Sequence, residues 1–118
     1  MKTEMDAKLV TIYVNSTDQW HGHALYTAIV QLCQRLSIAG ASVTRCAEGY
    51  GAGHHLHTSR LLELSQNLPV RIEIVDVAEK IDPLLSELGT MIGEGLVTVS
   101  NVHILRFNTD AKPGRTKP

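Results

Sequence analysis

The feature that most constrains the fold is the alternation in "VRIEIVD", the stretch that begins at Val70. Val70, Ile72 and Ile74 would form one apolar face of a strand, while Arg71 and Glu73 would point to the opposite side. A period of two over this length is typical of a strand that is buried on one side only. The chain is therefore expected to build a sheet with one covered face.

Three further stretches have strand character. They are short, rich in β-branched residues and bounded by turn residues. The strands are predicted at Lys8–Val14, Ala41–Glu48 and Gly95–Phe107, and the last of these is expected to bulge near Ser100–Asn101.

The first of two predicted helices follows the polar turn "NSTDQWHG". Its apolar residues Leu25, Ile29, Leu32 and Leu36 recur at helical spacing, and Gly40 stands where a C-cap glycine is expected.

The second helix is predicted over Val77–Ile92. Its apolar stripe comprises Ile81, Leu84, Leu85, Leu88 and Ile92. Pro83 leaves an alternative open, in which Asp82 caps a shorter helix with Pro83 in its first turn and Val77–Ile81 forms a separate turn.

The resulting order, β-α-β-β-α-β, predicts an α+β protein with the ferredoxin-like βαββαβ fold. Short connections and right-handed crossovers then give a four-stranded antiparallel sheet with two helices on one face. One domain is expected over residues 1–107, and a disordered tail over 108–118. The uncovered face, with Val75 and Val14 on it, predicts an oligomer in which a second subunit covers it.

Composition excludes several classes of function. The net charge of −1 and the aromatic content of 4% argue against nucleic-acid binding. Cys33 and Cys46 match no zinc spacing and are expected to be buried and reduced, and the N-terminal residues do not resemble a signal peptide, which together favour a cytoplasmic protein. No nucleophile has a recognisable base, and Asp76 with Glu79 resembles a helix cap, so no catalytic residue is assigned and the protein is predicted not to be an enzyme.

Two glycine-rich segments are candidate ligand sites. In "GYGAG", Gly49–Gly53, backbone N–H groups could form an anion-binding nest, although a flexible hinge is the alternative. In Gly93-Glu94-Gly95 the alternative is an ordinary helix cap and turn. His21 and His23 precede the first helix, where an anion site or a surface turn is possible.

A cluster of histidines follows the first glycine segment. His54, His55 and His57 carry imidazoles, which are common metal ligands and titrate near neutral pH. Carboxylates are sparse nearby, and Glu48 is the nearest in the sequence. Solvated loop histidines are the alternative interpretation, and His57 belongs to an "HTSR" motif that local hydrogen bonds would fix.

Three long segments carry a resemblance to a known family. "HGHALYTAIV", "GYGAGHHLHTSRLLELSQNLPVRIEIVD" and "GLVTVSNVHILR" resemble the uncharacterised prokaryotic family called domain of unknown function 190. The resemblance extends from Leu9 to Phe107 and rests on the motifs H-G-x-x-L-Y, G-Y-G and H-T-S-R.

That family is similar in turn to the PII nitrogen-signalling proteins. PII proteins are ferredoxin-like trimers that bind adenine nucleotides between subunits and move a long loop to control transporters and enzymes. The resemblance implies nucleotide contacts at two sets of positions. The first set is Gly49, Tyr50 and Gly51, and the second is Gly93, Glu94, Gly95 and Arg106. The predicted nucleotide site also includes Gly53, from the glycine segment, and Arg45, as a source of positive charge.

The chain departs from the PII pattern at two cationic positions. PII proteins have an arginine where this chain has Ala52 and a lysine where it has Leu96. The scaffold therefore carries over more fully than the phosphate contacts, and Arg45 or Arg106 would have to supply the missing charge.

Two functions are predicted from these observations. The first is a homotrimeric PII-like signalling protein that binds ATP, ADP or AMP and orders or releases the loop Tyr50–Ser65 to control a transporter or an enzyme. The alternative is a divalent-metal-binding trimer that resembles the cation tolerance proteins, with the metal on His54, His55 and His57.

Overall fold

The computed structural model describes residues 2–50, 57–58 and 68–108. Its main sheet has four strands in the order β4-β7-β1-β8, and every neighbouring pair is antiparallel. The strands of this sheet are β1 (Lys2–Asn15), β4 (Gly40–Arg45), β7 (Pro69–Asp76) and β8 (Leu96–Phe107). This order, with the central pair β1 and β7, is that of the predicted ferredoxin-like fold.

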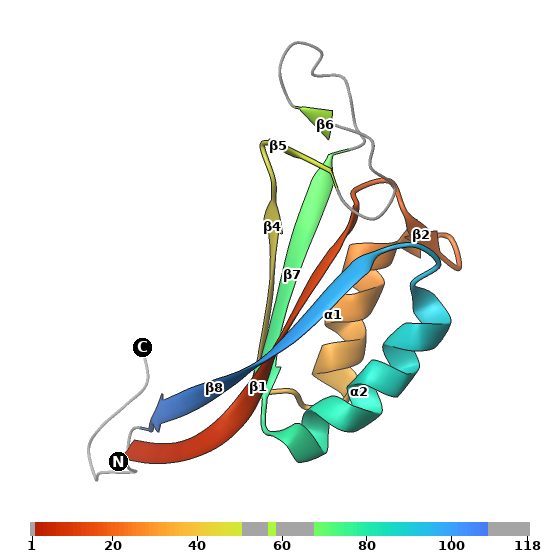
Figure 1. Ribbon diagram of the computed structural model, residues 1–118. Helices are drawn as coiled ribbons and strands as arrows, with labels where there is room; N and C mark the ends of the chain where they lie inside the picture. The colour runs from red at the N-terminus through yellow and green to blue at the C-terminus, as the bar shows by residue number, and fades with distance from the viewer. Residues whose placement is uncertain (1, 51–56, 59–67, 109–118) are drawn as a thin grey trace, which may run out of the picture.

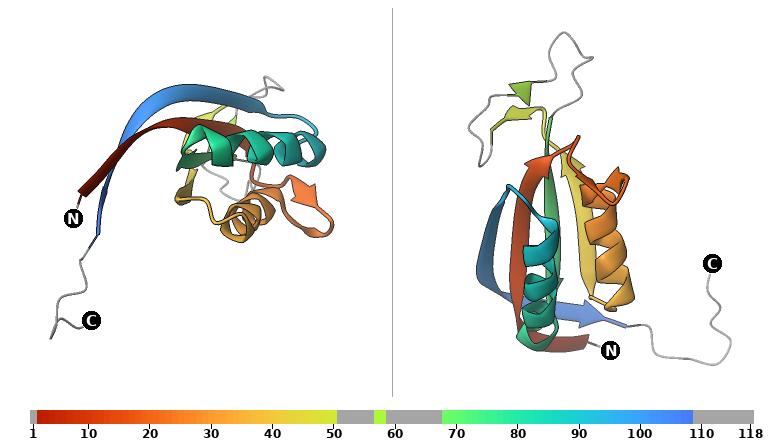
Figure 2. Two further views of the ribbon diagram at one scale, coloured as in Figure 1. Left: turned by 90° about the horizontal axis from the view of Figure 1, so that it is seen from below. Right: turned by 90° about the vertical axis from the view of Figure 1, so that its right-hand side faces the viewer.

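Two helices, α1 (Leu25–Arg35) and α2 (Ala78–Met91), lie on the same side of the sheet and leave the other side open (Figures 1 and 2). The described residues also contain two short pairs of strands. They are β2 (Gln19–Trp20) with β3 (His23–Ala24), before α1, and β5 (Glu48–Gly49) with β6 (His57–Thr58).

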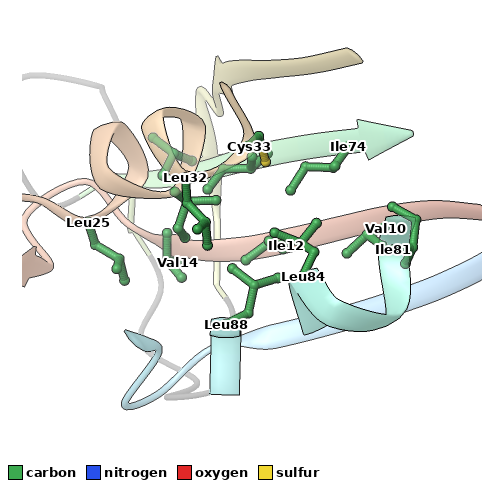
Figure 3. Packing of buried hydrophobic residues seen from close by; sticks show 13 residues of the cluster. Val10, Ile12, Val14, Leu25, Leu32, Cys33, Ile74, Ile81, Leu84 and Leu88 are labelled. Carbon is green, nitrogen blue, oxygen red and sulfur yellow. The ribbon is translucent and has the colours of Figure 1, made fainter. Parts of the chain in front are cut away.

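The core forms between the helices and the covered face of the sheet. Val10 and Ile12 of β1 belong to one buried cluster with Leu84 and Leu88 of α2 and Leu32 of α1 (Figure 3). Val70, Ile72 and Ile74 are each 0% exposed, as their alternation predicts. Burying a side chain of this size contributes about 1.5–3 kcal/mol, so this layer is the main source of stability.

Val14 corrects one sequence expectation. Its predicted place on the open face is wrong, because Val14 is 5% exposed within the core. The reason is register: Val14 pairs with Val70, in phase with Val10 and Ile12, and so points toward the helices. Val75 does lie on the opposite side, where it pairs with Leu9.

The C-terminus of α1 corrects the predicted role of Gly40, which is instead the first residue of β4. The helix ends in a Schellman motif around Ser37, whose φ is 55°. The Ser37 N–H donates to the Gln34 carbonyl at 3.1 Å, and the Ile38 N–H donates to the Cys33 carbonyl at 3.0 Å. The left-handed residue is therefore a serine, which a search for glycine caps misses.

Other boundaries also differ. The register between β1 and β8 is continuous from Lys2–Phe107 to Tyr13–Leu96, so the expected bulge at Ser100–Asn101 is absent. β1 begins at Lys2 rather than Lys8 because β8 is long enough to pair with it throughout. The strand expected over Ala41–Glu48 is interrupted after Arg45, where the Cys46 N–H donates to the Pro69 carbonyl at 3.0 Å.

Helix α2 is continuous through Pro83, so the alternative of two separate segments is wrong. Its N-cap is Val77, and neither Asp76 nor Glu79 caps it with a side chain. Asp76, 7% exposed, instead accepts hydrogen bonds from the Ala39 N–H at 2.8 Å and the Val77 N–H at 2.7 Å. This carboxylate joins the start of β4 to the start of α2.

The two cysteines are not joined by a disulfide. Cys33 is buried in the core, and burial raises the pKa of its thiol to about 11. Cys46 is half-buried. Cys33 is therefore an unreactive packing residue, buried as expected, whereas the expected burial of Cys46 is only partial.

Candidate functional site

The two glycine segments lie at the same end of the sheet but on opposite edges. The strand register places Leu96, Tyr13, Arg71 and Thr44 in one row across β8, β1, β7 and β4. Three strand spacings separate the ends of this row, about 14 Å in all. One copy of the chain therefore does not bring Gly49 and Gly95 together into a single cradle.

Gly49 lies in β5, just beyond β4. Its φ is 156°, a backbone conformation that residues other than glycine rarely adopt. A Cβ added at Gly49 would lie 3.8 Å from Cγ of Pro69. Tyr50 follows with 63% of its surface exposed. Gly51 and Gly53 lie outside the described residues, so their predicted role remains a prediction.

The two glycines of the second segment, Gly93 and Gly95, differ in their surroundings. A Cβ on Gly95 would meet Ile92 at 2.9 Å, Val14 at 3.1 Å and the Tyr13 carbonyl at 3.2 Å, so packing alone requires glycine there. A Cβ added to Gly93 would have nothing within 4 Å, and the φ of Gly93 is not left-handed. The end of α2 therefore gives no structural reason for a glycine at Gly93.

A pocket of about 180 Å³ opens beside this turn. It is lined by Asp18, Gln19, Leu25, Met91, Gly93 and Glu94. Two of these side chains are carboxylates and none is cationic, and the lysine position of PII proteins is occupied here by Leu96, which is 49% exposed. A phosphate bound at this turn would need its counter-charge from outside this pocket.

The two candidate arginines lie far apart. Arg45 ends β4, and its guanidinium donates to the Tyr26 hydroxyl at 3.5 Å, so it lies at the same end of the sheet as Gly49. Arg106 pairs with Thr3 at the opposite end of β8, ten residues from Leu96. At the rise of a strand this is roughly 33 Å, so Arg106 could join the glycine turn only from another copy.

The histidines before α1 form a surface turn. His21, with φ 50°, and Gly22, with φ 83°, are the two loop residues of the β2–β3 hairpin, which is the pattern of a type I′ turn. The His21 ring stacks on Trp20 with centroids 4.0 Å apart. Since the Leu25 N–H already donates to the Asp18 carbonyl at 2.8 Å, the first turn of α1 has one fewer donor for an anion.

The metal alternative receives no support from the described residues. Among residues 2–50, 57–58 and 68–108, no group of three His, Cys, Asp or Glu side chains could hold a metal ion. His57 lies in β6, and His54 and His55 fall outside those ranges. The histidine-loop prediction therefore remains a prediction.

Sequence reasoning missed two polar features that depend on register. His103 lies between Glu4 and Asp6, with Nε2 at 3.0 Å from Glu4 and Nδ1 at 3.4 Å from Asp6. On the open side of the sheet, Nε of Arg71 is buried without a hydrogen-bond partner within the described part of the chain. The charges at Arg71 and Glu73 were visible in the alternation, but the strands that flank them were not.

The helices in the described part of the chain are all too short or too polar to cross a membrane.

Comparison with known proteins places these features in a family. The model of the family DUF190, described as Uncharacterized ACR, matches residues 7–104. A UPF0166 protein of Methanocaldococcus jannaschii is 34% identical over 87% of this chain and 95% of its own length. A UPF0166 protein of Aquifex aeolicus is 30% identical over 83% of this chain and 92% of its own length.

Solved structures show the same fold at lower identity. A PII-like signalling protein of Thermus thermophilus aligns with a TM-score of 0.63 and 22% identity, covering 86% of this chain and 91% of its own. CPII, a nitrogen regulatory PII-like protein of Thiomonas intermedia bound to ADP, AMP and bicarbonate, aligns with a TM-score of 0.61 and 17% identity over the same shares. The βαββαβ chain is therefore PII-like in fold.

Proposed function

The chain belongs to the DUF190 family, and from this premise we propose that it is a PII-like regulatory protein rather than an enzyme. It works as a homotrimer and binds an adenine nucleotide in the clefts between subunits. The nucleotide changes the loop Tyr50–Ser65, which then exposes or hides a surface for a target such as a transporter or an enzyme.

The observation that carries this proposal is Gly93. Packing explains Gly95, but Gly93 does not have a positive φ and has open space around its Cβ position. A glycine without a structural reason fits a position where a ligand approaches the backbone closely. The neighbouring N–H groups of the turn would then hold an anion in the manner of a nest.

The separation of the two glycine segments favours a site between copies. Gly49 lies near one edge of the sheet and Gly93 near the other, at the same end. In a closed ring, the β8 edge of one copy faces the β4 edge of the next, which brings the two segments together. A trimer repeats this cleft three times.

Proteins of the same fold favour an adenine nucleotide as the ligand. Structures of the PII-like protein CPII are described as bound to ADP and AMP, and this chain shares their fold. Arg45 is exposed at the same end of the sheet as Gly49 and would supply a phosphate with positive charge. Arg106 would reach the cleft only from another subunit, and Tyr50 offers an exposed ring for a base.

The first prediction tests the role of Gly93 by calorimetric titration with AMP, ADP and ATP. The wild-type protein should bind at least one of them. Gly93→Ala should weaken that binding by at least about tenfold, equivalent to about 1.4 kcal/mol, because the methyl group occupies the ligand's approach. Its melting temperature should not fall, since a Cβ there contacts nothing.

The matched control is Gly89→Ala in α2, where an added Cβ also has nothing within 4 Å. It should leave nucleotide binding unchanged. Gly95→Ala should instead lower the melting temperature, because its Cβ would meet Ile92, Val14 and the Tyr13 carbonyl. Absence of binding heat with all three nucleotides, or wild-type affinity in Gly93→Ala, would contradict the proposal.

A further inference from the structure

The side of the sheet that faces away from α1 and α2, here called the open face, carries a mixed pattern of side chains. Alternation and register define its members on the two central strands. They are Leu9, Thr11 and Tyr13 of β1 and Arg71, Glu73 and Val75 of β7. All six are only partly exposed in the isolated chain. Figure 2 shows that no helix covers this side.

On the open face, one side-chain nitrogen of Arg71 lacks a hydrogen-bond partner among the described residues. This nitrogen is Nε, which is buried, and within the same residues the guanidinium takes part in no ion pair. A buried polar group without a partner costs about 1–3 kcal/mol, and more when it is charged. The described residues of one copy therefore leave this position without an acceptor.

Glu73 is the residue of opposite charge on the same face of β7. It lies on the same strand and the same face, two residues further along β7, and within the described ranges no ion pair joins it to Arg71. Two residues of extended strand span about 6.6 Å. Lys2 and Glu4 form an ion pair of 3.3 Å at this spacing, whereas Arg71 and Glu73 do not. The open face thus holds one cation and one anion without partners in the described part of the chain.

We propose that Arg71 of one copy pairs with Glu73 of a second copy when the open faces meet. The proposal rests on the trimer of the proposed function and names the polar contact that fixes it. A second copy is the occupant that complements the face, because every copy brings both signs of charge. Leu9 and Val75, which lie opposite each other in the register, would exclude water from the pair.

A free anion is a poorer occupant of the same position. It would satisfy Arg71 but would lie beside Glu73, which repels it and would itself remain unpaired. A second copy satisfies both groups. Since replacing only one partner of a buried pair leaves a buried charge, the pair would also select one register of the two faces.

The second prediction is a charge-reversal cycle measured by analytical ultracentrifugation over a range of protein concentrations. Arg71→Glu and Glu73→Arg should each raise the concentration at half-dissociation by about 100-fold or more, because like charges then face each other. The double variant should restore most of the wild-type value. Glu87→Arg, a reversal on the exposed surface of α2, should leave assembly unchanged.

Circular dichroism would establish that each variant is folded. If a reversal prevents folding, the neutral variants Arg71→Met and Glu73→Gln take its place, and each should still weaken assembly. Assembly that single changes do not weaken, or that the double reversal does not restore, would overturn the pair. Nucleotide titration on the same samples separates the outcomes: unchanged assembly with retained binding refutes only the pair, whereas a wild-type monomer without binding refutes both proposals.

Discussion

At the scale of single residues, His103 is a group whose pKa depends on the pairing of β1 with β8. Each ring nitrogen lies against a carboxylate: Nε2 against Glu4 and Nδ1 against Asp6. Carboxylates only accept hydrogen bonds, so both contacts are satisfied only by the doubly protonated ring. The hydrogen bond to Glu4, followed by that to Asp6, raises the pKa of His103 above its ordinary value.

The third prediction is that this pKa falls when the carboxylates are removed. NMR titration of the imidazole should show a larger decrease in Glu4→Gln than in Asp6→Asn, because Glu4 makes the shorter contact. Because the folded-state pKa is raised, the stabilising contribution is complete below the unfolded pKa of about 6.5 and is lost as pH rises through the folded value. Equal pKa values in wild type and both variants would contradict the geometry.

The pKa of Glu4 moves in the opposite direction, since His103 and then Lys2 stabilise its charged form. Its contribution is present above the unfolded pKa and is lost as pH falls through the lowered folded value. All these groups are largely exposed, so the cluster modulates the pairing of Lys2–Ala7 with β8 rather than the stability of the core.

At the scale of elements, α2 keeps a proline in its interior. Pro83 is the sixth residue of the helix, has no N–H to donate, and is exposed. The helix is continuous because Ile81, Leu84 and Leu88 on its buried face anchor it on both sides of the proline. Tertiary packing therefore overrides a strong local preference against helix.

The fourth prediction follows from that conflict. Pro83→Ala should raise the free energy of unfolding by about 1–2 kcal/mol, because the gain in helix propensity exceeds the greater entropy of the unfolded chain. Urea denaturation monitored by circular dichroism would measure it. The control is Ser86→Ala, at another exposed position of α2, which should change stability by less than about 0.5 kcal/mol. A destabilised Pro83→Ala would show that the proline itself shapes the helix.

At the scale of the whole molecule, the sheet is unevenly supported. β7 pairs with β1 only from Lys8 onward, so Lys2–Ala7 is paired with β8 alone and forms a two-stranded ribbon that curves away from the sheet (Figure 2). Most of the large exposed apolar side chains of the described residues lie on β8: Leu96, Val97, Val99, Leu105 and Phe107. Exposed apolar side chains gathered on an edge strand mark a surface suited to contact with another chain.

The fifth prediction concerns hydrogen exchange above and below the concentration at which the protein assembles. Amides of Val10 and Ile72 should be protected at both concentrations, because they belong to the core of the central strands. Amides of the ribbon should be protected only in the assembled protein, since a two-stranded pair is marginally stable alone. Equal protection of the ribbon at both concentrations would contradict this view of the β8 edge.

The sequence by itself determined the order of elements and the covered face of the sheet. The alternation of Val70, Ile72 and Ile74 and the helical spacing of Leu25, Ile29 and Leu32 were sufficient, because burial imposes these periods locally. The family motifs added the PII-like fold, which the solved structures confirm. The sequence identified Gly49 and Gly93 as candidate site residues, but it did not show which glycines are required by packing.

Tertiary structure alone decided what depends on register and on distance. Val14 joined the core because Val70 lies opposite it, and Ser37 took the left-handed position because Ile38 must turn back onto the end of α1. Strand register also places Arg106 far from Gly93, and it leaves Arg71 without an acceptor among the described residues. The sequence of one strand does not show which residues lie beside it, because that depends on how the strand pairs with its neighbours. Local periodicity therefore identifies the buried face of a helix or strand, whereas the pairing of strands distant in the sequence decides which residues come together in a site.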